Sequence, residues 1–271
     1  MRKKPDTGKR KSPGRSRKGK SVFPVVAIGA SAGGLEAVSQ FLRHLPSDTG
    51  MAYFYIQHLS RDHPSSLGLL LSRSTKMKVL EADDRLKVKP DHLYVCTPGK
   101  EMTVVNGSIR LRPRRADKLY YLIDEFFTSL AASYGKNTIG IVLSGNASDG
   151  TRGLMKIRKA GGLTFAQDNS AKYESMPRSA INNGAAIMVL SPKEMARELA
   201  AYGKNASPSA ARRRQKKETT VAGDPEGLKS IFEILYKRTG VDFSNYKIST
   251  IRRRLSYRNA SFRCKNPEKI P

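Results

Sequence analysis

The sequence predicts an α/β fold, a doubly wound and mainly parallel sheet with a β-hairpin, on three observations. Short, purely apolar runs without polar alternation, such as residues 25–28, suit strands buried on both faces of a parallel sheet. Segments with apolar residues at helical spacing follow several of these runs. The two kinds of segment alternate from residue 22 to about residue 202, which is typical of repeated β–loop–α units.

The first unit runs from a strand through a tight turn into a helix. The apolar run at 25–28 breaks into the small residues of 29–34, and an apolar stripe then resumes at Leu35, Val38 and Leu42. A second apolar run at 51–56 predicts the next strand, and a short helix is expected around 65–72.

The middle of the chain predicts a hairpin and further alternation. Two β-like runs flank Asn106-Gly107 within 102–111, a strong signal for a turn that needs positive φ. An amphipathic helix is expected over 118–134. The remaining predictions are a strand at 139–143, a helix to about 160, a strand at 163–166, a helix with Pro177 as its first residue, a strand at 187–190 and a helix at 192–202.

Composition divides the chain into four segments. Residues 1–20 read as a disordered basic tail, 21–203 as the α/β domain and 204–224 as a linker. Residues 225–271 predict a small all-α fragment, because apolar stripes recur there at helical spacing.

The net charge of +27 is unevenly spread, with ten Lys or Arg against one acid in residues 1–20. Basic tails can bind nucleic acid or anionic membrane, but this one lacks aromatic residues for stacking bases, so no specific nucleic-acid partner is expected. No apolar run is long enough to cross a membrane, and no secretory signal follows the charges. Two isolated cysteines, Cys96 and Cys264, suit a reducing compartment, so a cytoplasmic location is predicted.

The turn after the first strand places Ser31 between small residues. Gly29-Ala30-Ser31-Ala32-Gly33 fits the G-x-S-x-G pattern, in which small neighbours let a strained turn expose a serine hydroxyl. The same stretch is a degraded G-x-G-x-x-G dinucleotide fingerprint. A dinucleotide site wants an acid at the end of the next strand, where this chain has Gln57-His58. The nucleophile interpretation is therefore favoured.

A serine nucleophile needs a base, and the base needs a carboxylate. His58 stands at the carboxyl end of the adjacent predicted strand, and Asp149 lies in the small-residue loop after the strand at 139–143. Ser31, His58 and Asp149 could thus converge from three strand ends as a catalytic triad. Asp149 could equally cap the helix that begins at Gly150 or Thr151, and spacing leaves both interpretations open.

The remaining histidines do not indicate a metal. His58 and His63 are five residues apart and would not share a helical face, and no Cys or Glu joins them. No phosphate-binding motif is present either. Neither a metal nor another cofactor is therefore expected.

Five blocks together resemble the catalytic domain of CheB-type chemotaxis protein-glutamate methylesterases. They are Gly29–Gly34, Ile56–His58, Leu143–Gly150, Ala166–Asp168 and Ser175–Ile181, and the resemblance covers about residues 22–200. It implies a doubly wound α/β domain with Ser31, His58 and Asp149 in the catalytic roles. The family hydrolyses glutamate γ-methyl esters on the cytoplasmic helices of chemoreceptors, and some members also deamidate receptor glutamines.

The chain departs from the family pattern in places that bear on rate and regulation. Ala32 stands where members often have Thr, Asn146-Ala147 replaces a usual Met-Gly pair, and Ser175 replaces a common glycine. The family places an oxyanion donor near that pair. The usual phospho-receiver domain is expected to be absent, so regulation would depend on separate receiver or signalling proteins.

A second, shorter resemblance follows the linker. Residues 228–262, notably Gly240-Val241-Asp242-Phe243 and Arg252-Arg253-Arg254, resemble the N-terminal helical domain of CheR-type receptor methyltransferases. The fragment is truncated, so no methyltransferase activity is expected. Two rival functions stay open: a catalytically impaired receptor-binding module and a dinucleotide-dependent oxidoreductase.

Overall fold

The computed structural model describes residues 23–58, 66–114, 121–206 and 232–234. Its centre is a seven-stranded sheet in the order β3-β4-β2-β1-β7-β8-β9, in which every pairing is parallel. The predicted doubly wound, mainly parallel α/β fold is confirmed. The strands of this sheet are β1 (Val25–Ala30), β2 (Ala52–Gln57), β3 (Lys78–Glu81), β4 (His92–Val95), β7 (Thr138–Val142), β8 (Leu163–Gln167) and β9 (Met188–Leu190).

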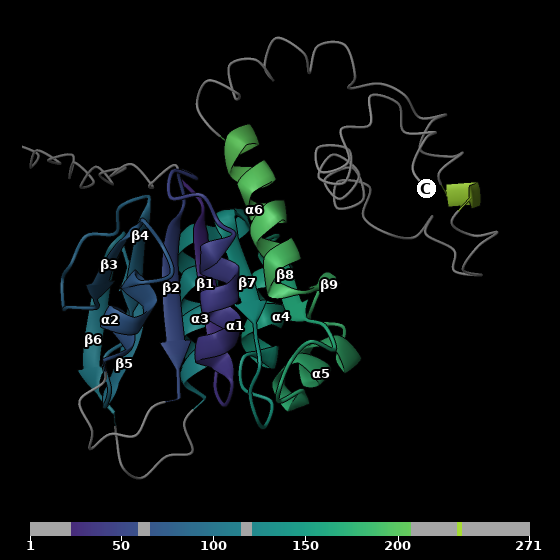
Figure 1. Ribbon diagram of the computed structural model, residues 1–271, viewed down its shortest axis with the longest axis horizontal. Helices are drawn as coiled ribbons and strands as arrows, with labels where there is room; N and C mark the ends of the chain where they lie inside the picture. The colour runs from purple at the N-terminus through teal and green to yellow at the C-terminus, as the bar shows by residue number, and fades with distance from the viewer. Residues whose placement is uncertain (1–22, 59–65, 115–120, 207–231, 235–271) are drawn as a thin grey trace, which may run out of the picture.

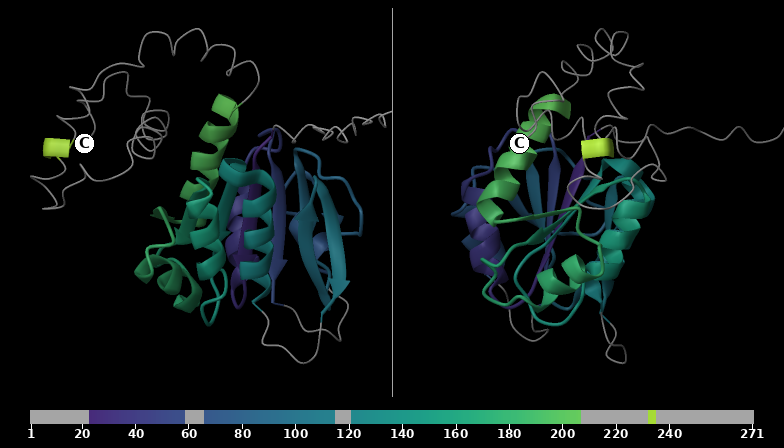
Figure 2. Two further views of the ribbon diagram at one scale, coloured as in Figure 1. Left: turned by 180° about the vertical axis from the view of Figure 1, so that it is seen from behind. Right: turned by 90° about the vertical axis from the view of Figure 1, so that its right-hand side faces the viewer.

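Helices cover both faces of the sheet, with α1, α2 and α6 in front of it in Figure 1 and α3 and α4 behind it. The second view of Figure 2 shows the same three layers edge-on. The helices are α1 (Gly34–Arg43), α2 (Leu67–Ser72), α3 (Leu122–Tyr134), a short 3-10 turn η1 (Gly135–Asn137), α4 (Thr151–Lys159), α5 (Ser175–Asn182) and α6 (Pro192–Ala206).

Two hydrophobic cores lie on the two faces because strand residues alternate between them. Val26 and Ile28 of β1 face the core of α1, α2 and α6, where Phe41 and Leu199 are fully buried. Ala27 faces the other core, which α3, α4 and α5 complete. Both faces of β1 are thus buried, which explains its unbroken apolar run.

The predicted hairpin forms a separate two-stranded sheet, β5 (Lys100–Val105) with β6 (Ser108–Pro113). Asn106 and Gly107 both have positive φ, 51° and 72°, as the turn signal required. The hairpin packs on α3, where Ser133 Oγ donates to the carbonyl of Val104 at 2.6 Å. It therefore extends one core without joining the main sheet.

Some elements differ from the sequence expectations. β3 and β4 were not predicted, because each has four residues and β3 is an edge strand whose side chains are exposed or half-buried. Pro177 is not the first residue of its helix: α5 begins at Ser175. Proline is tolerated there because the N–H groups of the first turn have no partner within the helix.

The predicted basic tail at 1–20 lies outside the described residues, as do the linker at 204–224 and the helical fragment at 225–271 apart from 204–206 and 232–234. The four predicted domain boundaries stay predictions. Within the described parts of the chain, none of the helices has both the length and the apolar character that crossing a membrane requires.

Candidate functional site

The loops at the carboxyl edge of the sheet bring the three candidate residues to one region. β1 is central, the chain then builds the sheet outward through β2, and it returns to the other side of β1 with β7. The boundary between β1 and β7 is thus the point where the strand order reverses, the usual place for a site in an open α/β sheet. Ser31 follows β1, His58 follows β2 and Asp149 lies in the loop after β7.

Ser31 and His58 lie on neighbouring strand ends. β1 and β2 pair so that Ala30 is opposite Gln57, one residue before each candidate. The backbone N–H of His58 donates to the carbonyl of Ala30 at 3.4 Å. Among the described residues, the Ser31 hydroxyl makes no hydrogen bond to the imidazole.

His58 and Asp149 are in direct contact, although 91 residues separate them. His58 Nε2 lies 2.8 Å from Asp149 Oδ2. A carboxylate only accepts hydrogen bonds, so Nε2 is the donor in this contact, and in the neutral ring Nδ1 is then the free acceptor. The imidazole is 26% exposed and the carboxylate 3% exposed, so the pair joins a buried acid to a ring open to solvent.

The Asp149 carboxylate is also held by the first turn of α3. The backbone N–H of Ile123 donates to Oδ2 at 3.0 Å, and those of Asp124 and Gly150 donate to Oδ1 at 2.9 and 2.8 Å. The alternative interpretation, that Asp149 is the N-cap of its own helix, is wrong, because Gly150 is the N-cap residue of α4. Asp149 instead satisfies free N–H groups of a different helix, at its positive end.

Ser144 connects the loop after β1 that contains Ser31, here called the serine loop, to the rest of the carboxyl edge. Its carbonyl accepts the N–H of Ser31 at 3.0 Å, and its hydroxyl donates to the carbonyl of Ala32 at 2.8 Å. Gln167, at the end of β8, accepts the N–H of Ser144 at 2.9 Å. The loop after β1 is therefore fixed by two other strand ends, which limits how far Ser31 can move.

Gln57 supports the serine loop from the other side. Its Nε2 donates to the carbonyl of Ser31 at 3.3 Å, and its Oε1 accepts from the Tyr55 hydroxyl at 2.9 Å. Burial raises the pKa of Tyr55 well above its ordinary value, so the phenol remains a neutral donor. Sequence reasoning placed Gln57 and Gln167 in the motif blocks but did not predict these contacts.

Gly145 packs directly against Ser31. A Cβ at this position would overlap Met176 Sδ and would lie 2.9 Å from Ser31 Cβ. A side chain at residue 145 would therefore displace the serine or α5. The loops pack here to a degree that only glycine allows.

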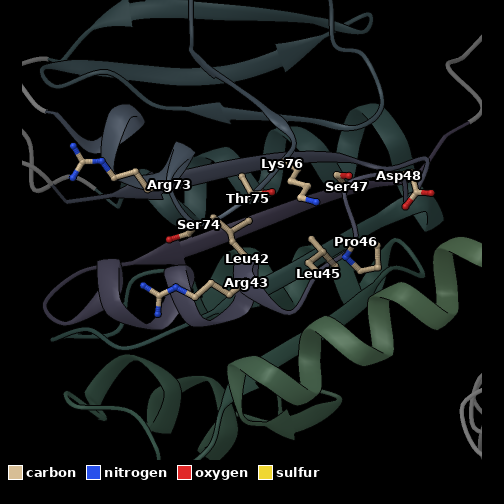
Figure 3. A pocket seen from close by; sticks show the side chains of 10 residues that line it. All are labelled: Leu42, Arg43, Leu45, Pro46, Ser47, Asp48, Arg73, Ser74, Thr75 and Lys76. Atoms are coloured by element: carbon tan, nitrogen blue, oxygen red, sulfur yellow. The ribbon is translucent and has the colours of Figure 1, made fainter.

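A separate pocket of about 490 Å³ lies at the opposite, amino edge of the sheet (Figure 3). The carboxyl ends of α1 and α2 and the residues that follow them line the pocket, and none of the three candidates is among the lining residues. Arg43 and Arg73 stand at the carboxyl ends of these helices, where cations offset the helix dipole. Within the described ranges, no cluster of three or more His, Cys, Asp or Glu residues could hold a metal ion.

A comparison with protein families identifies the domain that carries these residues. The family model described as CheB methylesterase matches residues 26–199. This chain belongs to the CheB methylesterase family. A second model, the all-alpha domain of CheR methyltransferase, matches residues 226–269, in line with the resemblance noted beyond the linker.

The chain is also similar to two curated proteins and to one solved structure. Protein-glutamate methylesterase FrzG of Myxococcus xanthus is 37% identical over 62% of this chain and 51% of its own length. A protein-glutamate methylesterase/protein-glutamine glutaminase of Xanthomonas campestris is 33% identical over 72% of this chain and 56% of its own. The crystal structure of the Thermotoga maritima CheB methylesterase catalytic domain matches with a TM-score of 0.60 and 28% identity, over 66% of this chain and 98% of that one.

The chain therefore spans just over half the length of these two curated relatives and nearly all of the solved catalytic domain. The described fold corresponds to the part of the family that the solved structure names as catalytic.

Proposed function

We propose that the chain is a chemotaxis protein-glutamate methylesterase, a serine hydrolase of glutamate γ-methyl esters on the cytoplasmic helices of chemoreceptors. The observation that carries the proposal is the hydrogen bond between His58 and Asp149, made beside the loop that holds Ser31. Family membership and relatives named for this activity support it. Deamidation of receptor glutamines is the same acyl chemistry with ammonia as the leaving group.

The proposed reaction uses the three residues in the usual order of a triad. His58 Nδ1 takes the proton of the Ser31 hydroxyl as Oγ attacks the ester carbonyl. Asp149 holds the ring through Nε2 and stabilises the imidazolium that forms. The imidazolium then gives its proton to the departing methoxide, and methanol leaves. Water hydrolyses the acyl-serine by the same base, which releases the glutamate carboxyl group.

Backbone N–H groups are the proposed oxyanion donors. The N–H of Ser31 already donates to the carbonyl of Ser144. Among the described residues, the N–H groups of Ala32 and Asn146 have no hydrogen-bond acceptor, and they lie in the loops after β1 and β7. They are suited to stabilise charge that develops on the carbonyl oxygen between these two loops.

Methanol release from a receptor fragment carrying labelled methyl esters tests the proposal. We expect turnover by the wild-type chain and a loss of about 10³-fold or more in Ser31→Ala, because no nucleophile remains. Ser47→Ala, at the distant amino-edge pocket, is the matched control and should keep full activity. Equal release by wild type and Ser31→Ala would refute a serine mechanism.

A second candidate function is a receptor-binding module with little turnover, and Ala147 favours it. Ala147 has φ 67°, a left-handed conformation that costs a residue with a Cβ about 1–2 kcal/mol. It replaces the glycine usual in the family, in the loop that would supply an oxyanion donor. Receptor binding without methanol release from the wild-type chain would support this alternative, and robust turnover would exclude it.

A further inference from the structure

A second buried carboxyl, Asp124, lies against Asp149. It is on the first turn of α3, and its own backbone N–H donates to Asp149 Oδ1 at 2.9 Å. The residue is 6% exposed. Its Oδ1 accepts the backbone N–H of Gly153 at 2.6 Å. Its Oδ2 is buried and has no hydrogen-bond partner among the described residues.

The close packing of α4 on α3 makes the hydrogen bond from Gly153 possible. A Cβ at Gly153 would lie 3.0 Å from Asp124 Cα and 3.1 Å from its carbonyl oxygen. Only a glycine lets α4 come close enough for its N–H to reach the carboxyl group. The approach of the two helices thus depends on both residues.

A carboxyl group in this place is costly for a purely structural role. The pKa of Asp124 is raised to about 6: burial raises it most, the Asp149 carboxylate also raises it, and the Gly153 N–H, Arg152 and the Gly150 N–H each lower it. An acid in the first turn of a helix is ordinarily favourable, but such residues are usually exposed, as Glu125 is here. An asparagine would accept from Gly153 equally well without a charge.

We propose that Asp124 is a positioning residue that acts through Asp149 to strengthen His58 as a base. The inference rests on the proposed hydrolase. Above pH 6 the Asp124 carboxylate adds a second negative charge close enough to interact with Asp149, which bonds to His58. Negative charge nearby favours the imidazolium over the neutral ring, and so favours removal of the serine proton.

The charged groups around Asp124 are few. Asp149 faces it from the loop after β7 and Arg152 from α4, while Glu125 on its own helix is exposed to solvent. Asp149 lies between Asp124 and His58: its Oδ1 accepts the backbone N–H of Asp124, and its Oδ2 bonds to His58 Nε2. Because Arg152 offsets part of the charge, the effect on His58 is expected to be moderate.

Asp124→Asn tests the charge, and Glu125→Gln removes the same charge from the next, solvent-exposed position. We would measure kcat/KM for methanol release from pH 5 to pH 9 with both variants and wild type. In Asp124→Asn we expect the acid limb to move to lower pH by about 0.5–1 unit and the plateau to fall about two- to tenfold. Glu125→Gln should leave both unchanged.

A second measurement does not depend on turnover. In a Ser31→Ala background, the His58 imidazole is titrated by NMR with and without Asp124→Asn. We expect the midpoint to move to lower pH by about 0.5–1 unit, the same shift as the acid limb. Asp124→Asn is near-isosteric, and circular dichroism checks that each variant is folded.

The outcomes separate the two proposals. Absence of methanol release from the wild type would refute the hydrolase, while the NMR shift would still report the coupling of Asp124 to His58. Turnover with an unshifted acid limb and an unshifted His58 midpoint in Asp124→Asn would overturn the inference. A lower rate without either shift would also overturn it, because it would assign Asp124 a structural role only.

Discussion

The two edges of the central sheet carry polar residues in opposite ways. At the carboxyl edge, Asp149 and Ser144 are almost fully buried, and their side chains bond to segments far away in the sequence. At the amino edge, the charged residues that line the pocket of Figure 3 are exposed, as Arg43, Asp48 and Lys76 show. Among the described residues, none of these three is part of an ion pair.

We therefore base the proposed site on the buried polar groups of the carboxyl edge and not on the amino-edge cavity. Burying a carboxylate or a hydroxyl is unfavourable unless hydrogen bonds compensate for the lost water. At the carboxyl edge such bonds converge on the ends of β1, β2, β7 and β8. The amino-edge pocket has a volume of about 490 Å³, yet its charged side chains are exposed to solvent.

Removing the Asp149 side chain should give the largest effect. In Asp149→Ala the His58 ring loses its partner, and the N–H groups of Ile123, Asp124 and Gly150 lose their acceptor. We expect the rate of methanol release to fall about 10³- to 10⁴-fold. The free energy of unfolding should fall by about 3 kcal/mol or more, because buried donors are left unpaired. Urea denaturation and kcat/KM provide the two measurements.

Asp48→Ala is the matched change at the amino edge. Asp48 is exposed and lines the pocket, so its removal should leave both quantities unchanged. If the two alanine variants lost activity equally, the distinction between the edges would be lost.

The sequence predicted much of the carboxyl edge, because several of its residues directly follow the strands that position them. The apolar run of β1 and the small residues around Ser31 are contiguous in the chain, as are β2 and His58. The roles of Ile123 and Asp124 could not be predicted, because they depend on α3 pointing its first turn at a loop about 25 residues later. The short strand β3 was missed because its side chains lack a buried pattern.

The pH dependence of stability should differ between wild type and Asp124→Asn. The pKa of Asp124 rises from 3.8 to about 6 on folding, so the folded state binds more protons than the unfolded state between these values. The contribution of the Asp124 carboxyl to the free energy of unfolding is therefore fully present below pH 4 and is lost as the pH rises through about 6. We expect the wild type to lose about 3 kcal/mol relative to Asp124→Asn between pH 4 and pH 7.

Urea denaturation of both proteins across this pH range measures how the free energy of unfolding changes with pH. A constant difference in stability between the two proteins does not affect this comparison. Glu125→Gln, whose carboxylate is exposed, should run parallel to the wild type. Parallel curves for Asp124→Asn and wild type would mean that Asp124 titrates as it does in water.

Filling the space at Gly145 should have an intermediate effect. In Gly145→Ala the new Cβ meets Met176 Sδ and Ser31 Cβ, so the serine loop or α5 must shift. We expect a loss of about 1–3 kcal/mol in the free energy of unfolding and about a hundredfold lower rate, because the nucleophile is displaced. The control is Gly68→Ala in α2, where the nearest atom, Glu81 Cγ, lies 3.7 Å away. That control should be neutral or slightly stabilising.

Replacing Ala147 should give the smallest effect, and with the opposite sign. In Ala147→Gly the left-handed backbone at φ 67° no longer carries a Cβ, so the strain of about 1 kcal/mol is relieved. The greater freedom of glycine in the unfolded chain offsets part of this gain. We expect a rise of up to about 1 kcal/mol in the free energy of unfolding, read from urea denaturation, with methanol release unchanged or faster. A slower rate in Ala147→Gly would mean that the strained loop is already suited to the reaction. Alanine in place of the family's usual glycine would then not have lowered the rate of methanol release.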